Sequence, residues 1–288
     1  MTEKLKMSIF FRVSIFLFLF SFGFPCFVQG EEKKALSVLL TNDDGIDAPG
    51  LAALYKELIS IAKVTVIAPQ ENKSGTGHAI TIRTPLRMKE FSKNGKLFGY
   101  ALNGTPADCV KFGLNKLLKQ QPDIIISGIN KGANVGMAVF YSGTIAGARE
   151  GAIHGIPSIA ASMVSSGKET VGYGFAAKFV KNLALLVRKN RIPPGIILNV
   201  NIPAKGEEAI KGVAITRQRL EDFPIDYEER ADTFKRTYYW MALDLHPLKL
   251  DPETDAGVVA KGMISITPLQ IDLTRYDLME MMKQWNFE

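Results

Sequence analysis

Residues 36–51 read Leu-Ser-Val-Leu-Leu-Thr-Asn-Asp-Asp-Gly-Ile-Asp-Ala-Pro-Gly-Leu, and this stretch decides the fold class. Its first five residues form a short apolar run, which predicts a buried β-strand. Asn42-Asp-Asp-Gly45 is a turn signal. Pro49 stands near the first turn of a helix, where its missing N–H costs least. The stretch therefore predicts strand, loop and helix in succession, which is the unit of parallel sheets covered by helices.

The same alternation continues outward from this stretch as far as Pro203. Apolar or β-branched runs predict further strands, and helical spacing predicts helices between them. The predicted strands are residues 64–68, 97–102, 123–127, 158–162 and 196–200, and the predicted helices begin at 106, 144 and 175. Strand–helix alternation of this kind predicts an α/β fold with a doubly wound, mainly parallel sheet.

The character of the chain changes after Pro203. Short strands are predicted at residues 213–218, 237–245 and 263–267, and the segment 221–236 is highly charged with little periodicity. We therefore expect an α/β core over residues 31–204. Residues 205–288 are expected to form a β-rich arm used in oligomerisation and a C-terminal segment that returns to the core.

Residues 1–30 have the pattern of a secretory signal peptide. Three basic residues precede residues 13–28, which carry no charge. A membrane anchor is the alternative, but sixteen residues fall short of the roughly 20 that span a bilayer, and Pro25 breaks the helix near its end. We expect cleavage after Gly30, export, a periplasmic location in a Gram-negative host, and no stable membrane association of the mature protein.

Composition excludes several classes of protein. Of the 288 residues, 47% are hydrophobic and 22% charged, which are ordinary globular values. Two Cys and three His cannot build a disulfide framework or a zinc finger, so any metal site must use mainly oxygen ligands. The formal charge is +6, and it falls to +4 when residues 1–30, with three bases and one acid, are removed. That mild balance predicts no nucleic-acid partner.

Ligands of doubly wound sheets bind at the carboxyl ends of the strands, and four polar loops follow predicted strands. The first loop carries Asp43 and Asp44. In a Gly-containing turn two such carboxylates can converge, and they then either share a proton or hold a hard divalent cation. The alternative is an Asx-turn that merely joins strand to helix.

Two further loops offer neutral oxygen ligands. Ser74 lies in the loop 70–78, and Asn130 lies in the loop 127–134. The alternatives are an ordinary flexible loop and an Asn that tolerates a tight turn. The loop 70–78 is no dinucleotide fingerprint, because Ile80 stands where the third glycine belongs. The chain also lacks the GxxxxGK phosphate loop.

The fourth loop, residues 141–144, precedes a predicted helix. Backbone N–H groups at a helix N-terminus, together with the hydroxyls of Ser142 and Thr144, make a phosphate-sized anion site. Simple N-capping is the alternative. His78 and His154 are predicted to be structural, and His78 has the better case for a role because it lies in a site loop. Taken together, the four loops predict metal-assisted phosphate chemistry.

These motifs resemble the SurE (survival protein E) family of 5′/3′-nucleotidases. The resemblance extends from about Leu36 to the C-terminus. It rests on Val38–Gly50, Ser74–Thr81, Asn103–Cys109, Ser127–Asn134 and Tyr141–Thr144, with 254–256 and 264–269 near the C-terminus.

The resemblance implies a Rossmann-like nucleotidase that hydrolyses nucleoside monophosphates. It implies one divalent cation per subunit, Mg²⁺ or Mn²⁺, bound by Asp43, Asp44, Ser74 and Asn130, with the two aspartates as catalytic residues. It also implies arm exchange in a homodimer or homotetramer. Binding of the substrate phosphate is assigned to Ser142, Gly143, Thr144 and Asn103.

Two features depart from the family pattern. The family is generally cytoplasmic and begins at its first strand, so a cytoplasmic location is the alternative to export. Residues 137–140 read Met-Ala-Val-Phe, where many relatives have polar or acidic residues. The competing function is an exported nucleotide- or phosphate-binding module without turnover.

Overall fold

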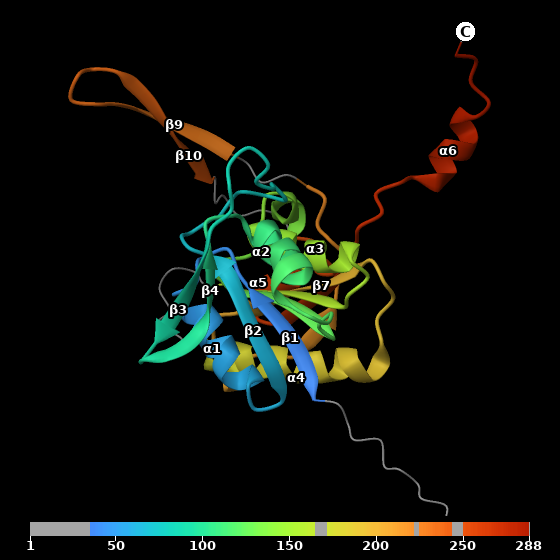
Figure 1. The fold of residues 1–288 in the computed structure, drawn as a ribbon. Helices are drawn as coiled ribbons and strands as arrows, with labels where there is room; N and C mark the ends of the chain where they lie inside the picture. The colour runs from blue at the N-terminus through green and yellow to red at the C-terminus, as the bar shows by residue number, and fades with distance from the viewer. Residues whose placement is uncertain (1–34, 165–171, 222–224, 244–249, 288) are drawn as a thin grey trace, which may run out of the picture. The chain divides into compact units, whose positions relative to one another are not determined.

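The computed structural model describes residues 35–164, 172–221, 225–243 and 250–287. The predicted signal peptide lies outside these residues. Nine strands form the main sheet, in the order β3-β4-β2-β1-β5-β6-β7-β11-β8 (Figure 1). Their bounds are β1 Leu36–Thr41, β2 Ala62–Pro69, β3 Met88–Lys93, β4 Lys96–Leu102, β5 Ile124–Lys131, β6 Ser158–Val164, β7 Ile196–Pro203, β8 Val213–Ile215 and β11 Ile264–Gln270.

Six neighbouring strands, from β4 to β7 in the sheet order, are parallel to one another. Within this nine-stranded sheet, antiparallel pairing is found toward the two edges, where β3 pairs with β4 and β11 pairs with β7. β8 pairs with β11 in the parallel sense. The prediction of a mainly parallel, doubly wound α/β sheet is therefore confirmed.

Helices cover both faces of this sheet. α1 (Pro49–Leu58) packs beside α4 (Gly174–Asn190), and α2 (Pro106–Phe112) packs beside α3 (Gly143–Ile153) on the other face (Figure 1). Side chains of β1 alternate between the faces, as a strand requires: Val38 and Leu40 pack with α1 and α4, and Leu39 packs with α2. Each fully buried leucine stabilises the fold by roughly 1.5–3 kcal/mol.

The helix starts predicted from the sequence are present. Thr105 caps α2 in a reciprocal capping box with Asp108, and Pro106 occupies the first helical position. Ser142 is the N-cap of α3, because its hydroxyl oxygen accepts a hydrogen bond from the Ile145 N–H at 3.1 Å. These caps fix where each loop at the carboxyl edge of the sheet ends.

Two strands and two α-helices were not predicted, namely β3, β9 (Ile225–Ala231), α5 (Asp255–Ala260) and α6 (Tyr276–Met282). β3 joins β4 through Asn94 and Gly95, which both have positive φ. That is the backbone of a two-residue hairpin turn, and Asn-Gly is its usual sequence.

The region after Pro203 divides between two sheets. β8 and β11 complete the main sheet, whereas β9 pairs with β10 (Thr237–Leu243) in a separate antiparallel ribbon, orange in Figure 1. Side chains along β9 are exposed, and α6 buries no residue. Within the described residues, no helix has both the length and the apolar character needed to cross a bilayer.

Candidate functional site

The candidate site lies where the strand order of the sheet reverses. From β1 the chain passes to β2 on one side, and β5 pairs with β1 on the other side. At such a point the loops that follow the two neighbouring strands run to opposite sides of the sheet. Ligands of doubly wound proteins bind in the space between these loops. Asp43 and Asp44 lie in the turn after β1, separated from the strand by Asn42, and Asn130 lies near the end of β5.

Asp43 is buried, with 3% of its surface exposed, and its carboxylate is held by a single residue of α3. The backbone N–H of Thr144 donates to Oδ2 at 3.0 Å, and the Thr144 hydroxyl donates to Oδ1 at 2.7 Å. Both donors of Thr144 are therefore engaged by the protein itself. In this structure Thr144 orients Asp43, a role that the sequence analysis did not assign to it.

Gly143 allows α3 to approach Asp43 this closely. A Cβ atom at position 143 would lie 2.8 Å from the Asp43 Cβ, which is closer than real Cβ atoms come, and 3.0 Å from its Oδ2, which is already a tight contact. Glycine is required at this position because a side chain would collide with Asp43, and not because of its backbone conformation.

The loop that carries Ser74 is tied to the same place. The Lys73 N–H donates to the backbone carbonyl of Asp43 at 2.7 Å, and the Gly77 N–H donates to the carbonyl of Tyr141 at 2.9 Å. Ser74 itself is exposed at the surface of the site. The two hydrogen bonds bring the loop beside Asp43 and the start of α3.

Asp44 faces the β5 loop instead. Its Oδ2 accepts a hydrogen bond from the Lys131 N–H at 3.0 Å. The neighbouring Asn130 is buried, and its Nδ2 donates to the Gly132 carbonyl at 3.0 Å, which leaves Oδ1 as the oxygen it can offer to a ligand. The four predicted ligand residues thus lie on the loop after β1, on the loop 70–78 and at the end of β5, and the loop after β1 is hydrogen-bonded to each of the other two.

Burial shapes the electrostatics of the two aspartates. Desolvation raises the pKa of Asp43, and the negative charge of Asp44 adds to the rise, while the hydrogen bonds from Thr144 oppose it. Desolvation also raises the pKa of Asp44, against the effect of the Lys131 amide and charge. Desolvation and mutual repulsion both disfavour the ionised form of two neighbouring carboxylates, and the protein groups described here offset these effects only in part.

This donor set fits a hard divalent cation, which prefers carboxylate, hydroxyl and amide oxygens. Asn42 Oδ1 and Ser127 Oγ are also buried, and neither has a hydrogen-bond partner among the described residues. Asn42 precedes Asp43 in the chain, and Ser127 lies within β5, where it pairs with Thr41. Within the described residues no three His, Cys, Asp or Glu side chains converge as a metal site, so neutral oxygens would have to complete the coordination.

Asn103 is engaged elsewhere in the structure. Its Oδ1 accepts a hydrogen bond from the Arg87 N–H at 2.6 Å, and its Nδ2 donates to the Pro85 carbonyl at 3.2 Å. The side chain therefore fastens the segment before β3. Its role in phosphate binding stays a prediction, as do those of Ser142 and Gly143.

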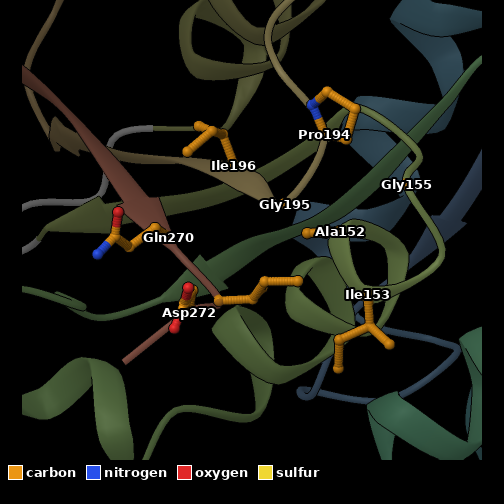
Figure 2. Close-up of a pocket in the computed structure, with 9 residues that line it drawn as sticks. Ala152, Ile153, Gly155, Pro194, Gly195, Ile196, Gln270 and Asp272 are labelled. Atoms are coloured by element: carbon orange, nitrogen blue, oxygen red, sulfur yellow. The ribbon is translucent and has the colours of Figure 1, made fainter. Parts of the chain in front are cut away.

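A separate pocket of about 360 Å³ lies at the opposite edge of the sheet, where β7 begins. Figure 2 shows it between the end of α3 and the end of β11, with Ile153, Pro194 and Ile196 among its lining residues. Gln270 and Asp272 contribute polar side chains to the lining of the pocket. It shares no residue with the site at the carboxyl edge.

Fold and site together define a Rossmann-like α/β protein that has paired carboxylates next to a helix N-terminus at the switch point of its sheet. Comparison with known sequences identifies the family. The family model described as "Survival protein SurE" matches residues 38–223, and the chain belongs to the SurE family.

Individual relatives agree with this assignment. A protein of Moorella thermoacetica named "5'-nucleotidase SurE" is 46% identical over 240 residues, which cover 83% of this chain and 92% of the relative. Another of that name, from Syntrophobacter fumaroxidans, is 43% identical over 251 residues, 87% of this chain and 100% of the relative. The crystal structure of the SurE protein from Aquifex aeolicus is 39% identical, with a TM-score of 0.75, and the match covers 86% of this chain and 98% of that one.

Proposed function

We propose that this protein is a metal-dependent phosphomonoesterase that hydrolyses nucleoside 5′-monophosphates, and also 3′-monophosphates, to nucleoside and phosphate. The carrying observation is that Asp43 and Asp44 lie at the switch point of the sheet, with the Asp43 carboxylate held at the N-terminus of α3 and the Asp44 carboxylate held at the end of β5. Membership of a family whose relatives are named 5′-nucleotidases supports the reaction class.

Asp43, Asp44, Ser74 and Asn130 would hold the cation, Mg²⁺ or Mn²⁺. When bound, such an ion polarises a phosphoryl oxygen and lowers the pKa of a water. Thr144 keeps the Asp43 carboxylate fixed, so the anionic ligand needs no reorganisation when substrate arrives. The N-terminus of α3, with Ser142 and Gly143, presents partial positive charge to the substrate phosphate.

The first experiment separates turnover from binding. The processed protein is incubated with AMP, GMP and 3′-AMP in Mg²⁺ or Mn²⁺, and released phosphate is measured. We expect release that stops in excess chelator. Nucleotide binding without phosphate release would favour the competing exported binding module.

The second experiment replaces Asp44 by Asn. The fold should persist, because the amide is isosteric with the carboxylate. The change removes an anionic ligand, so we expect turnover to fall by roughly two orders of magnitude or more. Wild-type turnover in this variant, with a wild-type circular dichroism spectrum, would reject the site.

We further propose that the protein acts outside the cytoplasm and begins near Glu31 after processing. The support is the basic start and the uncharged run of residues 13–28. N-terminal sequencing of the protein from fractionated cells tests this. An unprocessed chain that begins at Met1 and occurs only in the cytosol would contradict it.

A further inference from the structure

Glu150 is a buried carboxylate for which the proposed reaction has no use. It lies on α3, with 2% of its surface exposed. Glu150 comes seven positions after Gly143, which is nearly two helical turns, so Glu150 and the site-forming end of α3 lie on one side of the helix about 10 Å apart. A buried charge is costly unless it is paired, so its partners show what it holds in place.

Three basic side chains surround this carboxylate. His78 Nε2 lies 3.0 Å from Oε2, and Lys111 Nζ of α2 donates to Oε1 at 2.7 Å. His154 Nε2, at the end of α3, lies 3.4 Å from Oε1. Burial opposes ionisation of Glu150, but the bonds from His78 and Lys111 outweigh it and lower its pKa to about 2. The carboxylate is therefore an anion that bridges α3, α2 and the loop before β3.

His78 belongs to the loop that carries Ser74, four residues away. Backbone hydrogen bonds fasten the near end of this loop to Asp43 and Tyr141. Its far end is fastened to the capping box of α2, where Asp108 accepts from the Thr81 N–H at 2.9 Å and the Thr105 hydroxyl donates to the Ala79 carbonyl at 2.7 Å. The Thr81 hydroxyl also donates to Asp108 at 2.6 Å. The contact of His78 with Glu150 ties the middle of the loop to α3.

We propose that His78 and Glu150 act as positioning residues, which hold the loop 74–81 against α3 and so place the Ser74 hydroxyl for the cation. This inference rests on the proposed cation site. Neither residue touches the reacting groups. Their effect passes through the loop backbone, in the way that residues behind metal ligands orient those ligands.

His78→Ala removes the anchor, and His78→Gln restores a donor at nearly the position of Nε2. Lys111→Ala is the matched control, because it removes a partner of the same carboxylate without touching the loop. Mn²⁺ affinity is measured by calorimetry on the processed protein without nucleotide, and amide hydrogen exchange is followed over residues 74–81. Both readouts are independent of turnover, so failure of this proposal can be told from failure of the proposed hydrolysis.

We expect Mn²⁺ binding to weaken about tenfold in His78→Ala, the lower end of the range for residues that orient metal ligands. Exchange over the loop should be faster in that variant. His78→Gln should stay close to wild type, and so should Lys111→Ala. Two results overturn the proposal: His78→Ala with unchanged exchange and affinity, or Lys111→Ala with losses equal to those of His78→Ala.

Discussion

Asp43 and Asp44 are neighbours in the chain, but the fold gives their carboxylates different partners. Asp43 turns toward the start of α3, where Thr144 satisfies both of its oxygens. Asp44 turns toward the β5 loop and the Lys131 amide. This division fixes the Asp43 carboxylate at the start of α3 and holds the Asp44 carboxylate against the end of β5.

Replacement of Thr144 by Val tests whether Thr144 holds the Asp43 carboxylate in place. Valine fills the same space but cannot donate to Oδ1, so a buried carboxylate oxygen loses its partner at a cost of about 1–3 kcal/mol. The pKa of Asp43 should rise further, because the Thr144 hydroxyl normally opposes the effect of burial. We expect a lower melting temperature and slower phosphate release at neutral pH.

Thr144→Ser is the control for this prediction, since it keeps the hydroxyl and loses only a methyl group. Serine should restore most of the activity. If valine matches the wild type in both melting temperature and phosphate release, the hydroxyl does not hold Asp43 in solution.

At the scale of elements, the position of α3 against the β1 loop is set by the lack of a side chain at Gly143. Replacing this glycine by Ala should leave the helix intact, because alanine is the better helix former. The new methyl group would meet Asp43 at 2.8 Å. We therefore expect a large loss of phosphate release with little change in helix content by circular dichroism.

Gly174→Ala is a matched control, because Gly174 is also the first residue of its helix and a Cβ there meets nothing within 4 Å. That variant should retain wild-type activity. Equal losses in the two variants would show that the close approach of α3 to Asp43 is not what matters.

A second element-scale prediction concerns acid stability through Glu150. Its pKa is about 2 in the folded protein and 4.5 ordinarily. The carboxyl group of Glu150 therefore binds its proton more tightly in the unfolded chain. Ionised Glu150 stabilises the folded protein fully above pH 4.5, and this stabilisation is lost as the pH falls toward 2. Glu150→Gln should melt below the wild type at pH 6, and the gap should close on acidification. With the exposed Glu208→Gln as reference, a gap that stays constant from pH 6 to pH 3 would contradict the assignment.

At the scale of the whole molecule, the β9–β10 ribbon presents aromatic and apolar side chains to solvent. Tyr239, Trp240 and Met241 follow one another in β10 and are each more than half exposed. An isolated two-stranded ribbon is at best marginally stable in water. The ribbon would gain stability by burying these side chains on a symmetry-related copy, as the arm exchange implied by the family resemblance would provide.

We predict that the processed protein is at least a dimer, and that Trp240→Ser weakens the assembly. Sedimentation equilibrium at micromolar concentration measures the mass. Ile59→Ser, at the end of α1 and also about half exposed, should not change it. A wild-type mass of one processed chain would contradict the prediction.

The sequence was sufficient to predict a mainly parallel α/β sheet, and it placed the candidate site at the carboxyl ends of the strands. Buried strands such as β5 are apolar over several residues, and this pattern exists only because helices cover both faces. Acidic and glycine-rich loops at strand ends are likewise visible in the chain, because parallel strands bring their carboxyl ends to one edge. The Asn94-Gly95 turn also indicated a hairpin, and the prediction omitted β3 because that strand is polar and exposed.

Only the tertiary structure decided which donor serves which acceptor. Thr144 has the sequence signature of a phosphate-binding residue, and its donors go to Asp43 because α3 approaches β1 at a glycine. Asn103 was predicted at the phosphate, yet its amide fastens residues 85–87. His78 and Glu150 lie 72 positions apart, and nothing in either local sequence indicates the other. Local patterns follow from the backbone period of each element, whereas these pairings depend on how separate elements pack, which no short stretch of sequence encodes.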